Sequence, residues 1–357
     1  MIDIIPQIGL GTATLKGDDC IAAIEFAASI GYRMFDTALL YGNQVAVGEG
    51  IRKSGLLRDQ VWITSKVGFF PCDSDKVWMF SADNVKGSEA SSIDICLSQL
   101  KMDYVDLMLL HNPCTTAVEY NSATLPHFFE YFNATGGSSY TIKPSTLASG
   151  EDMRELILSV HRQRCRDIDK SIAFERRKQS WLALEDAQRS GKCRHIGVSN
   201  FPVEMLVEMK SYASVFPAYN ELEFHPRYAS PLLREVAAEM GVCLIGYGTG
   251  NSVVIGRALD HPSYRVLEDM AIRHGRSVMQ VLIRWTLQHG VVAIPRSRSN
   301  EHITQNIDVF GFELTADDMQ QLDALNEDHP YYWDRMSSMI VAGSDSRYDV
   351  AAKSHTK

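Results

Sequence analysis

The chain has 357 residues, of which 45% are hydrophobic and 22% are charged, and a mass of 40.0 kDa. This composition excludes a wholly disordered chain, and the length allows two domains or one large barrel. A net charge of −9 and a pI of about 5.7 argue against general affinity for nucleic acid or anionic membranes, both of which need a basic surface. We therefore expect neither partner, and any phosphate site must be a local basic cluster.

The seven cysteines predict a reducing compartment. Their number is odd and no two are spaced as Cys-x-x-Cys, whereas a disulfide framework or a zinc knuckle needs pairs. The first residues, Met-Ile-Asp-Ile-Ile-Pro, lack the basic start and the long apolar stretch of a signal peptide. We therefore expect a cytoplasmic protein with free thiols.

Short β-branched segments alternate along the chain with amphipathic segments. Several of the former are apolar without strict alternation, as in parallel strands that are buried on both faces. The expected strands are Ile5–Gly11, Tyr32–Thr37, Val61–Val67, Val105–His111, His195–Ser199, Ala218–Phe224, Val242–Tyr247 and Val291–Pro295. The expected helices are Cys20–Ser29, Val45–Lys53, Ser91–Leu100, Gln179–Ser190, Val203–Tyr212, Pro231–Met240, Tyr264–His274 and Val278–His289.

This alternation predicts βαβ units and a parallel sheet. Eight such units over about 300 residues predict an α/β fold, a closed (β/α)8 TIM barrel. The rival is an open doubly wound sheet, but no Gly-x-Gly-x-x-Gly follows an early strand. We expect a single barrel domain over residues 1–326 and a polar C-terminal tail over residues 327–357.

Two long connections interrupt the alternation, at about residues 68–88 and 114–178. They follow the carboxyl ends of the third and fourth expected strands, and barrels build their active sites on that face. Connections of such length are normally functional or partly disordered. We therefore expect long loop insertions at the C-terminal face of the barrel.

Four polar residues lie at or just past the ends of successive expected strands, namely Asp36, Tyr41, Lys66 and His111. A lysine that ends an apolar strand needs a partner to stay buried and charged, and Asp36 is the candidate. Lys66 beside Tyr41 would lower the pKa of the phenol from about 10 and make it a proton donor near neutral pH. Each residue alone also fits a structural role, but four on one face predict a catalytic site.

Five motifs, taken together and in order, resemble the aldo-keto reductase family. They are Gly9–Thr12, Phe35–Ala38 with Tyr41–Asn43, Ile196–Phe201, Asn220–Pro226, and Ile294–Ser297 with Asn300, Glu301 and Asn306. The resemblance implies an Asp–Tyr–Lys–His tetrad at Asp36, Tyr41, Lys66 and His111. It also implies hydride transfer between a nicotinamide and an aldehyde or ketone, with Tyr41 as general acid and base and a small carbonyl or alcohol as substrate.

The resemblance also assigns residues to the cofactor. Ser199 and Asn200 would donate to the nicotinamide carboxamide, and Tyr247 would stack on the ring, although Ser199 and Asn200 also fit a helix cap. An eighth-strand end followed by a short helix favours phosphate, so its arginines support NADP(H) over NAD(H), although they also fit a solvated surface. The full set is Thr12, Ser199, Asn200, Glu221, Tyr247, Gly248, Gly250, Arg296, Ser297, Arg298, His302 and Asn306.

The chain departs from the family pattern at several of these positions. The family usually has Gln where Glu221 stands, touching the carboxamide, and a carboxylate there would favour the oxidised, positively charged nicotinamide. It has Lys at Arg296, Arg at His302, Ser-Pro-Leu-Gly over residues 248–251, and bulky aromatics at Gly68 and Asn112. Because Gly68 and Asn112 stand in place of aromatics, we expect a wider and more polar pocket floor.

Two other functions stay open from sequence alone. One is a reductase-fold protein that binds the cofactor as a sensor or partner surface with little turnover. The other is a barrel enzyme of another class, such as a metal-dependent hydrolase, which needs clustered ligands at strand ends. Only His111 and His225 are histidines at such positions, so we expect no metal. The sequence does not decide the oligomeric state, for which we favour a monomer.

Overall fold

Eight strands form a single parallel sheet in the computed structural model, which describes residues 4–68, 89–113, 170–250 and 262–328. Each strand pairs with the next in chain order, and the Gly9 N–H donates to the Ala293 carbonyl oxygen at 2.8 Å, which joins the last strand to the first. The sheet is therefore curled into the (β/α)8 arrangement that the alternation predicted. The strands are β1 (Leu10–Gly11), β2 (Met34–Asp36), β3 (Trp62–Val67), β4 (Val105–Leu110), β5 (Cys193–Ser199), β6 (Tyr219–Glu223), β7 (Cys243–Tyr247) and β8 (Val292–Ala293).

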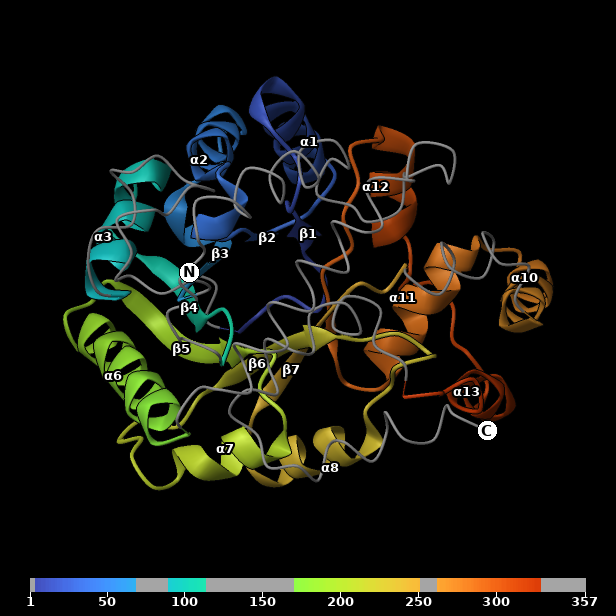
Figure 1. Cartoon of the computed structure of the whole chain (residues 1–357). Coiled ribbons are helices and arrows are strands. Elements are labelled where there is room, and N and C mark those ends of the chain that lie inside the picture. The colour runs from blue at the N-terminus through green and yellow to red at the C-terminus, as the bar shows by residue number, and fades with distance from the viewer. Residues whose placement is uncertain (1–3, 69–88, 114–169, 251–261, 329–357) are drawn as a thin grey trace, which may run out of the picture.

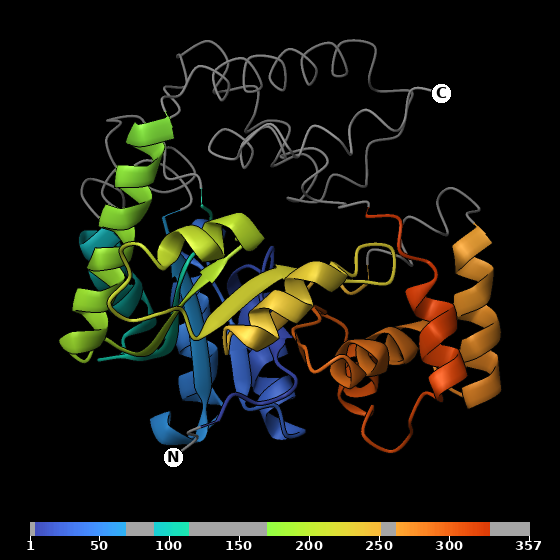
Figure 2. The ribbon, with the colours of Figure 1, turned by 90° about the horizontal axis from the view of Figure 1, so that it is seen from below.

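Helices surround this sheet in chain order, so that α12 packs beside α1 where the ring closes (Figure 1). Turned by 90°, the green helix α6 and the orange helix α10 lie on opposite sides of the strands (Figure 2). The described helices are α1 (Gly17–Ser29), α2 (Gln44–Lys53), α3 (Glu89–Leu100), α6 (Lys170–Arg189), α7 (Val203–Met209), α8 (Pro231–Glu239), α10 (Pro262–His274), α11 (Val278–Gln288), α12 (Asn300–Ile307) and α13 (Ala316–Asp323). Two short 3-10 helices are η1 (Leu39–Tyr41) and η2 (Arg58–Gln60).

All eight expected helices are present, but the start of α6 was predicted wrongly. It begins at Lys170 rather than at Gln179, because the charged segment before Gln179 reads as part of an insertion. Arg177 lies in that segment and is buried, since its guanidinium pairs with Glu208 on α7 at 2.6 Å. An ion pair of this kind leaves no apolar period in the sequence. Residues 69–88, 114–169 and 329–357 lie outside the described residues, so the loop and tail boundaries stay predictions.

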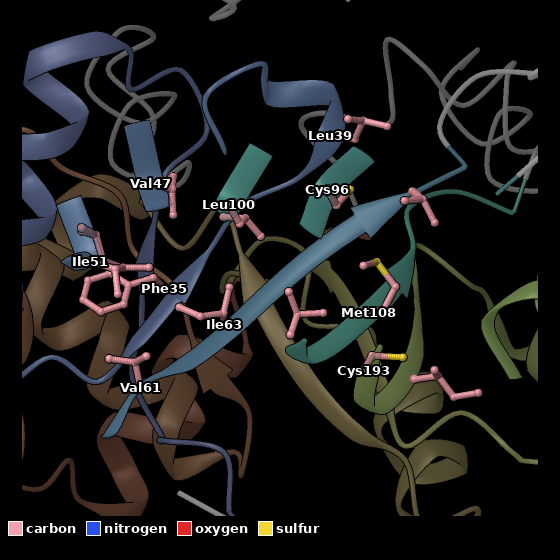
Figure 3. Close-up of a cluster of buried hydrophobic side chains, with 14 of the residues drawn as sticks. Phe35, Leu39, Val47, Ile51, Val61, Ile63, Cys96, Leu100, Met108 and Cys193 are labelled. Atoms are coloured by element: carbon pink, nitrogen blue, oxygen red, sulfur yellow. The ribbon is translucent and has the colours of Figure 1, made fainter. Parts of the chain in front are cut away.

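The core has an outer and an inner layer. Phe35, Ile63 and Met108 point outward from the strands and pack under the buried side chains of α2 and α3, such as Val47 and Leu100 (Figure 3). The α2 backbone passes so close to α3 that a Cβ on Gly48 would overlap the Leu100 carbonyl group.

The inner layer fills the middle of the curled sheet with the buried side chains of Met34, Trp62, Leu109, Tyr219 and Ile245. Successive side chains of a strand point to opposite faces, so the residue two places after an inward one also points inward. The polar residues that end these strands therefore share the face of the inner core.

Candidate active site

Four polar side chains meet at the carboxyl ends of β2, β3 and β4. Asp36 lies two residues after inward-facing Met34, Lys66 lies four after Trp62, and His111 lies two after Leu109. Strand alternation therefore turns all three toward the interior. Tyr41 joins them from η1, the 3-10 helix that follows β2. The structure thus brings together all four residues predicted from the strand ends.

Lys66 is the centre of this group and is fully buried. Its Nζ donates to both carboxylate oxygens of Asp36, at 2.7 and 2.6 Å, and to the Thr37 carbonyl oxygen at 3.1 Å. It also donates to the Tyr41 hydroxyl at 3.4 Å. Burial by itself would lower the pKa of Lys66, but the carboxylates around it outweigh burial and raise that pKa. Lys66 is therefore a fixed positive charge beside the phenol.

The ionisation of Tyr41 differs from the sequence-based expectation. Burial raises the pKa of Tyr41 above its ordinary value, and the Lys66 ammonium opposes the rise without cancelling it. Asp36 and Glu221 add to the rise, because their negative charges disfavour a phenolate. Lys66 acts in the expected direction, but the expected net lowering of the Tyr41 pKa was wrong for this reason, and Tyr41 holds its proton at neutral pH.

His111 lies against Tyr41, with the two rings edge to face and their centroids 5.8 Å apart. Burial lowers the pKa of His111 well below its ordinary value, and the positive charge of Lys66 lowers it further. The imidazole is therefore neutral and can hydrogen-bond an oxygen atom without carrying charge.

Glu221, on β6, also reaches this group. Its Oε1 lies 3.2 Å from Lys66 Nζ, although β6 and β3 are not neighbouring strands. Burial raises the pKa of Glu221 well above its ordinary value, the nearby Asp36 carboxyl adds to the rise, and Lys66 opposes it. The side chain of Glu221 therefore lies against Lys66 inside the catalytic group, and its burial favours the protonated form.

The residues expected at the nicotinamide lie next to the four polar side chains. Asn200 follows β5 with a left-handed φ of 64°, which asparagine tolerates better than other non-glycine residues. Its Nδ2 donates to the His111 carbonyl oxygen at 3.0 Å and to Ser199 Oγ at 2.9 Å, and its Oδ1 accepts from the Tyr247 hydroxyl at 2.7 Å. A helix cap is not their role, since Pro202 is the N-cap residue of α7 and no side chain caps that helix.

The residues expected at the cofactor's phosphates form a second group between β8 and α12. The exposed Arg296 donates from Nη1 to the Ala13 carbonyl oxygen at 3.0 Å and to the Thr14 hydroxyl. The remaining members are the partly buried Ser297, the exposed Arg298 and His302, and the buried Asn306 of α12. Two exposed arginines thus lie at the N-terminal end of a helix, where free N–H groups favour an anion.

Three further expected residues line the ends of β1 and β7. Thr12 is buried, and its hydroxyl donates to the Asp36 carbonyl oxygen at 2.8 Å. Gly248 has a left-handed φ of 71°, which explains glycine there. A Cβ on Gly250 would lie 3.1 Å from Met279 Sδ. Between the two glycines, the buried hydroxyl of Thr249 has no hydrogen-bond partner within the described part of the chain.

Sequence reasoning missed the residues that hold these loops. Asn43 is buried, its Nδ2 donates to the carbonyl oxygens of Thr12 at 2.8 Å and Leu15 at 3.0 Å, and its Oδ1 accepts from Thr37 Oγ1 at 2.8 Å. Asn220 similarly donates to the Phe201 carbonyl oxygen at 2.8 Å. Asn220 lies inside β6 and Asn43 directly before α2, and an asparagine at such a position is the signal that could have identified each.

The described residues offer neither a metal centre nor a membrane span. Across the four described ranges, no group of three or more His, Cys, Asp or Glu residues could hold a metal ion, and the metal-free site stays a prediction. None of the helices in those ranges combines the length and apolar character that a membrane span requires.

The chain was compared with known proteins. The model of the Aldo/keto reductase family matches residues 7–327. Glyoxal reductase of Bacillus subtilis is 32% identical over 325 residues, which cover 91% of this chain and 90% of that protein. Morphine 6-dehydrogenase of Pseudomonas putida is 32% identical over 330 residues, which cover 90% of this chain and 88% of that protein. A solved aldo/keto reductase from Brucella melitensis is 25% identical, with a TM-score of 0.63 over 90% of this chain and 94% of that chain.

Proposed function

Because this chain belongs to the aldo/keto reductase family, we propose that it is an NADP-dependent reductase of small aldehydes or ketones, with Tyr41 as general acid and base. Membership makes it a nicotinamide-dependent oxidoreductase that acts on carbonyl or alcohol groups. The observation that carries the proposal is the buried ammonium of Lys66, held by Asp36 and set 3.4 Å from the Tyr41 hydroxyl. The four free thiols of the described residues suit a cytoplasmic location, which is part of this proposal.

The residues of the site have separate tasks in this reaction. A bound nicotinamide supplies the hydride in reduction and accepts it in oxidation. Tyr41 donates its proton to the carbonyl oxygen in reduction and takes a proton from the alcohol in oxidation. Lys66, kept charged by Asp36, stabilises the phenolate that Tyr41 becomes after donating. His111 is neutral and hydrogen-bonds the same substrate oxygen, which orients the carbonyl group.

The residues present fit a nicotinamide dinucleotide. Asn200 and Ser199 offer an amide and a hydroxyl beside His111, and the orphaned buried hydroxyl of Thr249 is a further donor at the end of β7. Arg296 and Arg298 would hold the phosphates of the adenosine end. Glu221 is the exception, because its carboxyl contacts Lys66 and does not offer the amide that the family usually has there.

The proposed substrate class is supported by the name of one relative. One of the similar proteins is named glyoxal reductase, which suggests small dicarbonyls. Gly68 directly follows β3. Its backbone has a left-handed φ of 79°, and a Cβ there would overlap the Leu110 side chain. A bulky aromatic at this position is therefore excluded by the backbone and by the Leu110 side chain, and the wider pocket floor expected from the sequence stays a prediction.

Consumption of NADPH with glyoxal, methylglyoxal, an aromatic aldehyde and a simple ketone tests the function. We expect turnover with at least one aldehyde and weaker turnover with NADH. Tight binding of NADPH without turnover of any carbonyl would instead support the alternative, a reductase-fold protein that binds the cofactor as a sensor or interaction surface.

We expect Arg296→Ala to weaken NADPH binding by about 10- to 100-fold while leaving NADH binding nearly unchanged. The reason is the loss of a charge-assisted contact to the additional phosphate, on the order of 1.5–3 kcal/mol. Fluorescence titration of both cofactors measures it. Arg189→Ala is the matched control, since Arg189 pairs with Asp186 on the exposed surface. An equal loss of affinity for NADPH and NADH would show that Arg296 does not recognise the additional phosphate.

We also propose that the segment around residues 114–169 controls substrate access rather than folding of the barrel. It follows β4, whose carboxyl end carries His111, and it precedes α6, whose Trp181 and Leu184 are in the core. Closing a loop of half the length changes the free energy of closure by only about 0.6 kcal/mol. Removing residues 121–150 should therefore preserve the circular dichroism spectrum and change KM and substrate range. An insoluble product would show that the segment belongs to the core.

A further inference from the structure

Two carboxyl groups contact the same ammonium group inside the barrel. Asp36 holds Lys66 from the neighbouring strand β2 at 2.6 Å, and Glu221 holds it from β6, on the far side of the interior, at 3.2 Å. Lys66 is 0% exposed, and each carboxyl group is only 2% exposed. Water therefore cannot stabilise the charges of these groups, and each charge must be neutralised by the other groups of the cluster.

The charges do not balance if both carboxyl groups are ionised. Two carboxylates against one ammonium leave a buried net charge of minus one, which is costly, so one of the two groups keeps a proton. Asp36 has the closer contacts with Lys66, which leaves Glu221 as the main holder of that proton. Among the described residues, the other titratable groups that contact the cluster are Tyr41 from η1 and His111, which directly follows β4. His111 is neutral, so Tyr41 is the group whose ionisation Glu221 can influence.

We propose that Glu221 is a positioning residue for the Tyr41 proton: it shares one proton with Asp36 across Lys66, and on losing that proton it holds Tyr41 in the phenol form. A negative Glu221 raises the pKa of Tyr41, because it opposes a second negative charge nearby. Carbonyl reduction needs the phenol and alcohol oxidation needs the phenolate. Glu221 therefore favours reduction and moves oxidation to higher pH, which the neutral amide of glutamine cannot do. This inference rests on the proposed function.

Infrared difference spectroscopy of the cofactor-free protein tests the proton sharing without any turnover. At neutral pH, wild type minus Glu221→Gln should contain the C=O band of a protonated carboxyl group, shifted in D₂O. Glu223→Gln is the matched control, since Glu223 is buried on the same strand but contacts His225. The Glu223→Gln protein should keep that band, so the band should be absent from the difference spectrum of wild type minus Glu223→Gln. The proposal would be overturned if the difference spectrum of wild type minus Glu221→Gln contained only the bands of an ionised carboxylate.

The pH dependence of alcohol oxidation with NADP⁺ tests the effect on Tyr41. The rising limb of kcat/KM should move to lower pH in Glu221→Gln, by on the order of one pH unit, and stay in place in Glu223→Gln. A limb that does not move in Glu221→Gln would overturn the proposal, even if Tyr41→Phe abolishes activity. If the wild type itself turns over no substrate, the proposed function fails, and the infrared result alone decides whether Glu221 shares the proton.

Discussion

Replacing Tyr41 by phenylalanine is expected to lower kcat for carbonyl reduction by about 10²–10⁴-fold, the usual effect of removing a general acid. The substitution removes only the hydroxyl that lies 3.4 Å from Lys66 Nζ and leaves the ring beside His111. The dissociation constant of NADPH should stay within about twofold, because none of the proposed cofactor contacts involves that hydroxyl. Steady-state kinetics and fluorescence titration of the same protein preparation measure both quantities.

Tyr104→Phe is the matched control for this variant. Tyr104 precedes β4, at the end of the strand opposite to His111, and its hydroxyl accepts from Arg194 at 2.8 Å. Its loss should leave kcat near the wild-type value. The assignment of Tyr41 would be wrong if Tyr41→Phe kept a wild-type kcat on a substrate whose reduction shows a solvent isotope effect.

Replacing Lys66 by methionine is expected to reduce the free energy of unfolding by about 3–5 kcal/mol at neutral pH. The substitution leaves Asp36 and Glu221 buried without the ammonium that both contact. The loss should depend on pH in a defined direction. Without Lys66, the folded-state pKa values of both carboxyl groups rise further above the unfolded values of about 4, so the destabilisation is smallest below about pH 4 and grows as pH increases.

Urea denaturation at several pH values measures this loss, and Lys192→Met is the matched control. Lys192 pairs with Asp94 at 2.5 Å, but both side chains are well exposed, so its removal should cost at most about 1 kcal/mol. Adding Asp36→Asn to Lys66→Met should restore part of the lost stability, since one unpaired carboxyl group is then gone. Equal stability of the Lys66 and Lys192 variants at neutral pH would contradict a coupled buried cluster.

The order of the barrel could be predicted because its signals are local. Each strand is a short apolar run and most helices have an apolar period, so all eight strands and eight of the ten described α-helices were placed from neighbouring residues alone. Asp36, Lys66 and His111 could be selected in the same way, as polar residues at strand ends. The start of α6 was predicted wrongly because the charged segment before Gln179, although helical in pattern, was assigned to the insertion, and its contact through Arg177 is with Glu208 on another helix.

By itself, the sequence determined which elements form, their order around the sheet, and which polar residues end the strands. Only the tertiary structure decided how those residues behave. Glu221 meets Lys66 because β6 and β3 face each other across a closed sheet, a contact that no spacing along the chain encodes. The pKa of Tyr41 rises rather than falls because it depends on burial and on every charge packed around the phenol, and both arise only when distant strands come together.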